Sequence, residues 1–198
     1  MVQALEKHDY TSEEYLAFEV ESQERHEYID GDIILMSGGT PNHSKITLNL
    51  ASSLNFGLKR QPYDVFASDQ RLQIPKRRIY TYPDVMVIAQ PLEYAPNRRD
   101  TLTNPLIIAE VLSKSTEAYD RSGKFAAYRT IPSFQEYVLI DQYAMHVEHY
   151  VKTDNRKWIF SEYDGAEAVL TLSSVAFEIG LADLYDKVDF EKEAATER

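Results

Sequence analysis

Two apolar runs of strand length, at residues 83–89 and 105–112, constrain the fold of this chain more than any other feature of the sequence. Both contain several Val and Ile residues, and β-branched side chains favour strands. The runs therefore predict two neighbouring strands in the core, joined by the loop 90–104.

The segment before these runs contains signals for two helices and several strands. Thr11 and Glu14 are spaced as a capping box, which predicts a short helix over about 11–19. The Asp30-Gly31 pair within the alternating segment 26–36 indicates a two-residue hairpin. A stripe of apolar residues four apart, Ile46, Leu50, Leu54 and Leu58, predicts a helix over 43–59. Short strands are expected near 63–67 and 70–74.

The C-terminal half predicts one more helix and a series of strands. Thr116 is a candidate cap for a helix over about 117–130, with Phe125, Ala126 and Tyr128 as buried candidates, and Pro132 prevents its continuation. The apolar segment 136–141 is expected to form a buried strand. Segments 145–151, 157–163 and 168–172 are expected to form a β-meander, and the residues after about 186 a polar tail.

The order helix, three or more strands, helix, strand predicts the fold class. Because strands and helices do not alternate strictly, we expect an α/β protein of the α+β type, a mixed β-sheet flanked by helices with added β-hairpins, rather than a doubly wound parallel sheet. The 198 residues suit a single domain, 1–198, with a core at about 10–185 and an acidic tail at about 186–198.

The composition excludes several classes of function. The chain has no cysteine, which removes disulfides, thiolate zinc sites and cysteine nucleophiles. We find no apolar run of about eighteen residues, so no membrane span is expected. The first residues lack the features of a secretory signal, and a soluble cytoplasmic protein is the simplest expectation.

The net charge of −11 argues against tight non-specific DNA binding, since phosphates repel carboxylates. The acids are concentrated at the ends, with nine acids and two bases in residues 1–30 and six acids and three bases in residues 182–198. Residues 71–78 and Arg98-Arg99 are locally basic. Solvated surface is the common role of such clusters, and contact with phosphates is the alternative.

Asp84 and Glu110 carry the strongest signal for chemistry. If the two apolar runs pair antiparallel with Ala89 opposite Pro105, Asp84 lies directly opposite Glu110 on one sheet face, with Cβ atoms roughly 4.5–5.5 Å apart. Two such carboxylates repel each other, and a divalent cation such as Mg²⁺ relieves the repulsion. Without metal, one of the pair should have a raised pKa. The alternative is that Asp84 caps a strand and Glu110 pairs with a base.

These residues carry a family resemblance that covers about residues 10–185. The pattern Pro83-Asp84, Glu110 and a helix bearing Lys124 resembles the PD-(D/E)XK nuclease superfamily. More closely, the chain is similar to the bacterial family described as "putative restriction endonuclease", formerly a domain of unknown function. The matching stretches are 27–31 (EYIDG), 43–44 (HS), 82–85 (YPDV), 110–113 (EVLS), 115–116 (ST), 120–124 (DRSGK) with Tyr128, and 136–141 (EYVLID). The resemblance implies a restriction-endonuclease-like core of helix, three strands, helix and strand.

One departure from the superfamily pattern concerns its lysine. The motif places lysine two residues after the acid, where this chain has Leu112. The family resemblance implies that Lys124 supplies this group instead, four residues after Asp120 on one helical face. Lys114 is the competitor, because it continues the alternation of the strand. The alternative is that Asp120 and Lys124 form an ordinary exposed salt bridge with no catalytic role.

The resemblance also implies a mechanism and a ligand set. Asp84, Glu110 and the Val111 backbone carbonyl would hold Mg²⁺ or Mn²⁺, and Lys124 would orient water and stabilise charge on the phosphate. Glu27 resembles an acidic residue that some of these nucleases supply from near the N-terminus, although an exposed hairpin acid is the alternative. His43, at a helix start near this face, is a further supporting candidate, with a core or capping role as the alternative.

Three hypotheses for function remain open at this point. The first is a metal-dependent DNA endonuclease, expected to act as a homodimer if it cuts both strands. The second is a catalytically inactive module with the nuclease fold that binds nucleic acid or a partner protein. The third is a hydrolase of another phosphodiester. The complete set of Asp84, Glu110 and Lys124 favours the first.

Overall fold

A six-stranded mixed sheet forms the centre of the protein in the computed structural model, which describes residues 9–154 and 156–191. Its strand order is β11-β10-β9-β8-β6-β3, and β8 and β9 are parallel while the other neighbours are antiparallel. The strands are β3 (Tyr63–Ala67), β6 (Val85–Ala89), β8 (Pro105–Leu112), β9 (Glu136–Asp141), β10 (His146–Asp154) and β11 (Lys157–Asp164).

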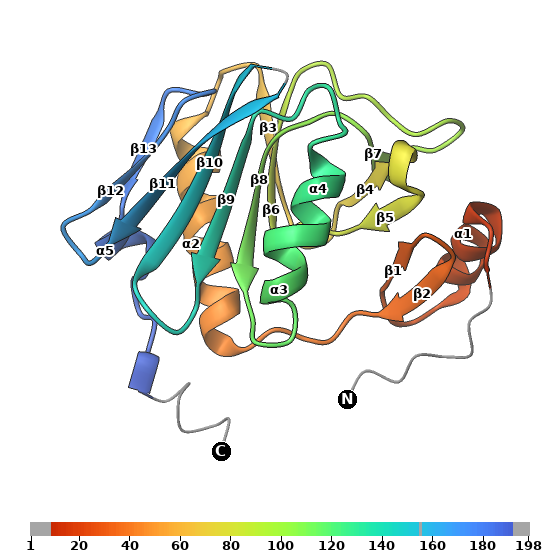
Figure 1. Ribbon diagram of the computed structural model, residues 1–198, viewed down its shortest axis with the longest axis horizontal. Coiled ribbons are helices and arrows are strands. Elements are labelled where there is room, and N and C mark those ends of the chain that lie inside the picture. Colours follow the sequence, from red (N-terminus) through yellow and green to blue (C-terminus); the bar gives the residue numbers. More distant parts are fainter. Residues whose placement is uncertain (1–8, 155, 192–198) are drawn as a thin grey trace.

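Helices cover both faces of the central sheet (Figure 1). On one face lies α2 (Pro41–Gly57), and on the other lies a helical segment made of α3 (Glu117–Tyr119), the π-helical turn η2 (Asp120–Lys124) and α4 (Phe125–Tyr128). Successive strand residues alternate between the two cores: Val85 and Val87 pack with α2, whereas Met86 and Ile88 pack with α4. The predicted mixed sheet flanked by helices is therefore confirmed.

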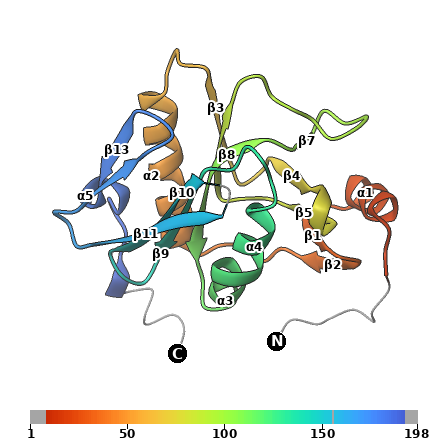
Figure 2. The same cartoon turned by 45° about the horizontal axis from the view of Figure 1, so that its top comes forward.

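A second sheet lies beside the central one and carries the N-terminal helix (Figure 2). Its order is β2-β1-β5-β4-β7, with only β4 and β7 parallel. The elements of this unit are α1 (Ser12–Glu21), β1 (His26–Ile29), β2 (Asp32–Leu35), β4 (Arg71–Ile74), the 3₁₀ helix η1 (Pro75–Arg77), β5 (Ile79–Thr81) and β7 (Thr101–Leu102).

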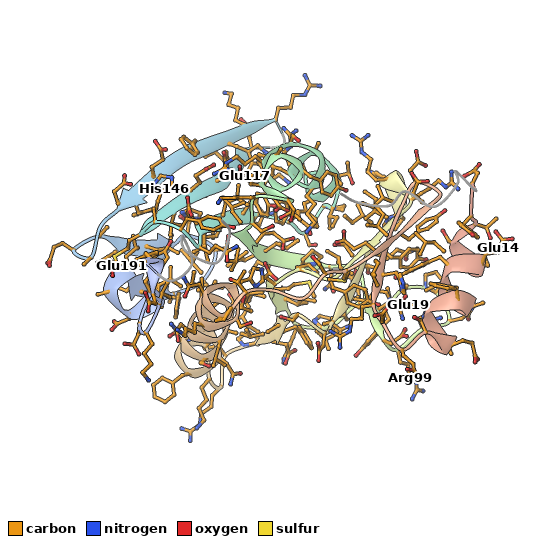
Figure 3. All side chains as sticks on the ribbon, turned by 90° about the horizontal axis from the view of Figure 1, so that it is seen from below. Glu14, Glu19, Arg99, Glu117, His146 and Glu191 are labelled. Atoms are coloured by element: carbon orange, nitrogen blue, oxygen red, sulfur yellow. The ribbon has the colours of Figure 1, made fainter. Side chains whose placement is uncertain are left out.

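The two ends of the molecule carry different elements. Figure 3 places Glu14 and Glu19 of α1 at one end and His146 and Glu191 at the other, with Glu117 of α3 between them. The far end contains a two-stranded sheet of β12 (Val169–Leu172) and β13 (Phe177–Gly180), followed by α5 (Leu181–Leu184). No helix in the described part of the chain is long and apolar enough to cross a membrane.

Local signals predicted several elements correctly. Thr11 and Glu14 form both hydrogen bonds of a capping box at the start of α1. Asp30 and Gly31 adopt φ angles of 47° and 103° in the turn between β1 and β2, which is the left-handed region that such a hairpin requires. The helix predicted from residue 43 begins at Pro41 instead, because Thr40 caps it and proline is well suited to the first helical turn.

Other expectations were wrong in detail. Thr116 makes no side-chain capping bond, and the helix predicted over 117–130 is interrupted by the π-helical turn η2 and ends at Tyr128. The segment 168–172 does not continue the meander, because β12 pairs with β13 in a separate sheet. The loop 90–104 contains β7, which pairs with β4.

Part of the predicted acidic tail, 186–198, lies within the described residues. Asp189 exchanges two hydrogen bonds with Asn42 of α2, through its N–H and its carbonyl oxygen. Val188 and Phe190 pack against the core beneath α2. Residues 192–198 lie outside the described residues.

The observed register between β6 and β8 agrees with the predicted one beside Asp84 and Glu110. It differs at the other end of the strand pair, near Pro105. Val85 pairs with Ala109 and Val87 with Ile107, so extension of the same register brings Asp84 opposite Glu110. An irregularity after Val87 makes Pro105 pair with Ile88 rather than with Ala89. The irregularity lies away from the two carboxylates and leaves their alignment intact.

The packing of α2 gives a matched pair of stability tests. Leu54 is 2% exposed in the core beneath α2, whereas Leu48 on the same helix is 65% exposed. Leu54→Ala should lower the free energy of unfolding by about 2–5 kcal/mol, because it removes buried methyl groups and leaves a cavity. Leu48→Ala should change it by less than about 0.5 kcal/mol. Urea denaturation of both variants measures the difference, and equal losses would contradict the packing of α2.

Candidate active site

Asp84 and Glu110 meet at the end of the central sheet where β6 begins and β8 approaches its end. The backbone N–H of Asp84 donates a hydrogen bond to Glu110 Oε2 at 3.3 Å. The Glu110 side chain is 4% exposed and the Asp84 side chain is 18% exposed. Glu110 lies on the same face of β8 as Ile108 and Leu112, which pack in the core beneath α4. The carboxylate of Glu110 therefore lies at the border between an apolar core and the surface.

Two donors hold one oxygen of Asp84. Oδ2 accepts a hydrogen bond from the Val111 N–H at 2.8 Å and lies 3.1 Å from His43 Nε2. His43 lies in the first turn of α2, where its N–H donates to the capping residue Thr40. Burial works to lower the pKa of His43, but the hydrogen bond and charge of Asp84 outweigh it and raise this pKa. Within the described residues, Oδ1 of Asp84 has no hydrogen-bond donor, so it is the oxygen open to a ligand.

Glu110 is held by a tyrosine and a lysine. Tyr128 Oη donates to Glu110 Oε1 at 2.7 Å, and Lys124 Nζ lies 3.2 Å from the same oxygen. Burial raises the pKa of Glu110 to about 8, with the charges of Asp84 and Asp120 acting in the same direction and Lys124 and Tyr128 opposing them. The expected raised pKa in the pair therefore falls on Glu110, the more deeply buried of the two carboxyls.

Lys124 is surrounded by carboxylates. Its Nζ lies 3.2 Å from Glu110 Oε1, 3.3 Å from Asp120 Oδ1 and 3.7 Å from Glu27 Oε1, and its side chain is 13% exposed. Burial alone would lower its pKa, but the charges of Glu110 and Glu27 hold the pKa well above the ordinary value. The surrounding carboxyl groups therefore favour the ammonium form of Lys124.

Asp120 lies at the opposite end of the π-helical turn from Lys124. Its side chain is 3% exposed, and Oδ1 is within ion-pair distance of Lys124 but makes no directed hydrogen bond. We regard the contact as an electrostatic one, because the distance is short while the angle is poor. The contact holds Lys124 over Glu110.

Glu27 reaches the site from the second sheet. It lies on β1, and its Oε1 accepts a hydrogen bond from Thr81 Oγ1 of β5 while facing Lys124. The side chain is 15% exposed. Glu27 is thus not the exposed hairpin acid of the alternative interpretation, and the N-terminal unit supplies part of the site.

The oxygen atoms at this site suit a hard divalent cation as ligands. The N–H and C=O of an extended residue point to the same strand edge, so the Val111 carbonyl lies on the Asp84 side of β8, as its N–H does. Among the residues the structure describes, no group of three or more His, Cys, Asp or Glu side chains is arranged to hold a metal. The available set is therefore two carboxylates and a carbonyl, and Mg²⁺ commonly binds with so few protein ligands and keeps several waters.

The structure brings together all six predicted side chains: Asp84, Glu110, Lys124, Glu27, His43 and Asp120. Lys114 Nζ instead lies over the Tyr143 ring, 5.1 Å from its centroid. The sequence did not assign the hydroxyls of Tyr128 and Thr81 to the site. Tyr128 lies four residues after Lys124 in a predicted helix, and that spacing is the signal that could have identified it.

Three arginines of the basic stretches pair with acids. Arg71 is buried and pairs with Asp100 at 2.6 Å, so the expectation of a solvated side chain is wrong for it. Arg78 pairs with Asp9 and Asp30. Arg98 pairs with the same Asp100 as Arg71. Acids thus neutralise these three side chains, whereas Lys76, Arg77 and Arg99 lie exposed.

The mixed sheet flanked by helices is the architecture expected of a restriction-endonuclease-like protein. Residues 12–182 match the model of the Uma2 family, described as "putative restriction endonuclease", and the chain belongs to this family. The family membership predicted from the sequence is therefore confirmed.

Similar proteins cover most of the chain. The uncharacterized protein sll1609 of Synechocystis sp. (strain ATCC 27184 / PCC 6803 / Kazusa) is 44% identical over 163 residues, which are 82% of this chain and 92% of that protein. The uncharacterized protein slr1290 of the same organism is 36% identical over 180 residues, which are 90% and 92% of the two chains.

A solved structure shares the fold. The crystal structure of a "putative nuclease belonging to DUF820" from Anabaena variabilis ATCC 29413 superposes with a TM-score of 0.73 at 22% identity. The match covers 89% of this chain and 98% of that one. At this identity the likeness shows the fold alone, and it confirms the predicted restriction-endonuclease-like architecture.

The raised pKa of Glu110 can be measured directly. We expect its carboxyl carbon to titrate near pH 8 in ¹³C NMR spectra of the metal-free protein, and this signal should be absent in Glu110→Gln. The folded state holds this proton up to about pH 8, whereas an unfolded glutamate releases it near 4.5. Rising pH between these values therefore lowers the contribution of Glu110 to stability. Titration near 4.5 in the folded protein would contradict the burial of this carboxyl.

Proposed function

We propose that this chain is a metal-dependent endonuclease that hydrolyses DNA phosphodiester bonds, with Mg²⁺ or Mn²⁺ held by Asp84, Glu110 and the Val111 carbonyl. The observation that carries the proposal is the position of Lys124, whose ammonium group lies 3.2 Å from Glu110, the carboxyl group that accepts a hydrogen bond from the Asp84 N–H. Two carboxylates and one ammonium at a partly exposed strand end match the parts that this class of nuclease requires. Membership of the Uma2 family supports the proposal.

The excess of carboxylates supports a cation at this position. Glu110, Glu27 and Asp120 surround the ammonium of Lys124, and Asp84 adds a fourth carboxyl group beside His43. When bound, a divalent cation supplies a Lewis acid that polarises a phosphate oxygen and lowers the pKa of water. It would also favour the ionised form of Glu110, because opposite charge lowers a carboxyl pKa.

The protein residues position the two carboxyl groups and supply hydrogen-bond donors. His43 and the Val111 N–H fix Asp84 with one oxygen free, and Tyr128 fixes Glu110. Lys124 holds a proton at Nζ and is placed to donate it in hydrogen bonds to water and to a phosphate oxygen on which charge develops. Fixed donors of this kind stabilise the transition state more than the ground state. Asp120 and Glu27 keep Nζ in place.

Cleavage assays test the reaction. We expect the full chain to cut supercoiled plasmid in Mg²⁺ or Mn²⁺, and Asp84→Asn and Glu110→Gln to lower the rate at least about 100-fold by removing a metal ligand. Lys124→Met should lower kcat by a similar factor but leave metal binding measurable, because Lys124 is not a ligand. Glu178→Gln, an exposed acid on β13, is the matched control and should retain full activity.

The outcomes separate the rival functions. Equal cleavage by the wild type and both acid variants would show that the activity comes from elsewhere. DNA binding without cleavage or metal binding would favour the inactive nuclease-fold module instead. Cleavage of bis(p-nitrophenyl) phosphate but not of plasmid, linear or single-stranded DNA would point to another phosphodiester.

The pKa of Glu110 predicts how metal binding depends on pH. Glu110 must lose its proton to act as a ligand, so the Mg²⁺ affinity should rise with pH, by up to about tenfold per unit, and level off above about 8. Isothermal titration calorimetry in buffers of different ionisation enthalpy measures both the affinity and the released proton. Affinity that is constant from pH 6 to 9 would show that Glu110 is not a ligand.

A further inference from the structure

Tyr119 lies at the end of α3, directly before the π-helical turn that carries Asp120 and Lys124. Its ring packs on the backbone of Gly123: a Cβ placed on Gly123 would lie 2.4 Å from Tyr119 Cε2 and 2.6 Å from Cδ2. No side chain fits at position 123 while the ring stays where it is. The π-helical turn therefore fixes Tyr119 as well as Lys124, and π-turns are frequent at functional sites.

The Tyr119 hydroxyl differs from those of the neighbouring tyrosines. Tyr128 donates to Glu110 at 2.7 Å, and Tyr137 donates to the Asp120 carbonyl oxygen at 3.1 Å. Tyr119 is only partly buried, and within residues 9–154 and 156–191 its hydroxyl has no hydrogen-bond partner. Its donor is thus available to a ligand, and the ring on Gly123, next to Lys124, together with the charges of Glu27 and Lys124 that act on the hydroxyl, places Tyr119 near the site.

The electrostatic surroundings keep this hydroxyl protonated. Burial, followed by the charge of Glu27, raises the pKa of Tyr119 to about 12, with Lys124 opposing the shift. The hydroxyl therefore stays a neutral donor under working conditions. Lys124 is already shared among three carboxylates, so an anionic substrate gains from a second donor nearby.

We propose that Tyr119 is a further substrate-contacting residue, whose hydroxyl donates a hydrogen bond to a phosphate oxygen of the nucleic-acid backbone, and that Gly123 is the residue that positions its ring. This inference rests on the proposed function, because it names how the same site holds its substrate. A neutral donor suits the place, since it attracts the phosphate without a counter-charge that the nearby carboxylates would neutralise.

The contact is expected to act mainly on substrate binding. A hydrogen bond made equally to the substrate and to the transition state changes KM and leaves kcat nearly unchanged. Tyr119→Phe, which removes only the hydroxyl, should raise KM for plasmid cleavage about tenfold. Gly123→Ala should displace the ring and raise KM similarly. The double variant should be little worse than either single one, because both remove the same contact.

The experiment measures three quantities on the full-length chain and each variant. These are plasmid-cleavage kinetics in Mg²⁺, Mg²⁺ affinity by calorimetry, and binding of a fluorescein-labelled DNA duplex in Ca²⁺ by anisotropy. Tyr94→Phe is the matched control, since Tyr94 is 46% exposed in the loop before β7. Circular dichroism and thermal melting of each variant check that it folds.

The results distinguish this inference from the proposed function. Weaker duplex binding and a raised KM in Tyr119→Phe, with unchanged Mg²⁺ affinity, would support the contact. Normal KM and normal duplex binding in Tyr119→Phe would overturn it, even if the wild type is an active nuclease. If the wild type binds the duplex without cutting it, the proposed function fails, and weaker binding by Tyr119→Phe would still support the contact. A wild type that neither binds nor cuts DNA would overturn both.

Discussion

The contact between the Lys124 ammonium and the Glu110 carboxyl group is the interaction on which the rest of the site depends. A buried carboxylate without a partner is costly, and Glu110 interrupts an otherwise apolar strand. Lys124 offsets that cost from a helix, and it also contacts Glu27 of the second sheet. One ammonium group therefore ties together the central sheet, the helix that covers it and the N-terminal unit. A cation beside Asp84 and Glu110 would complete the same charge balance.

The sequence predicted the fold and the central carboxylate pair because both depend on local, periodic signals. Strands of period two fix which residues share a face, and one matched register then places Asp84 opposite Glu110. The capping box at Thr11 and the turn at Asp30-Gly31 are also local, and both formed as expected. The choice of Lys124 over Lys114 came from the family resemblance, and the geometry supports it.

The remaining features depend on contacts between distant segments, which periodicity does not encode. His43 meets Asp84 only because α2 starts where β6 starts, and Thr81 reaches Glu27 only because β5 pairs with β1. The short strands β5 and β7 are held by their neighbours and have little pattern of their own. The π-helical turn escaped prediction because its sequence, 120–124, suits an ordinary helix.

The contact between Glu27 and Lys124 joins positions 97 residues apart in the chain, and Thr81 lies between them. Closing so long a loop costs chain entropy, so a contact of this kind slows folding more than a local one does. During synthesis, a ribosome-bound fragment that ends before Lys124 contains Asp84 and Glu110 but not the ammonium that neutralises them. A chain that ends before residue 124 therefore lacks the ammonium group that the proposed chemistry requires, although both proposed metal-binding carboxylates are present.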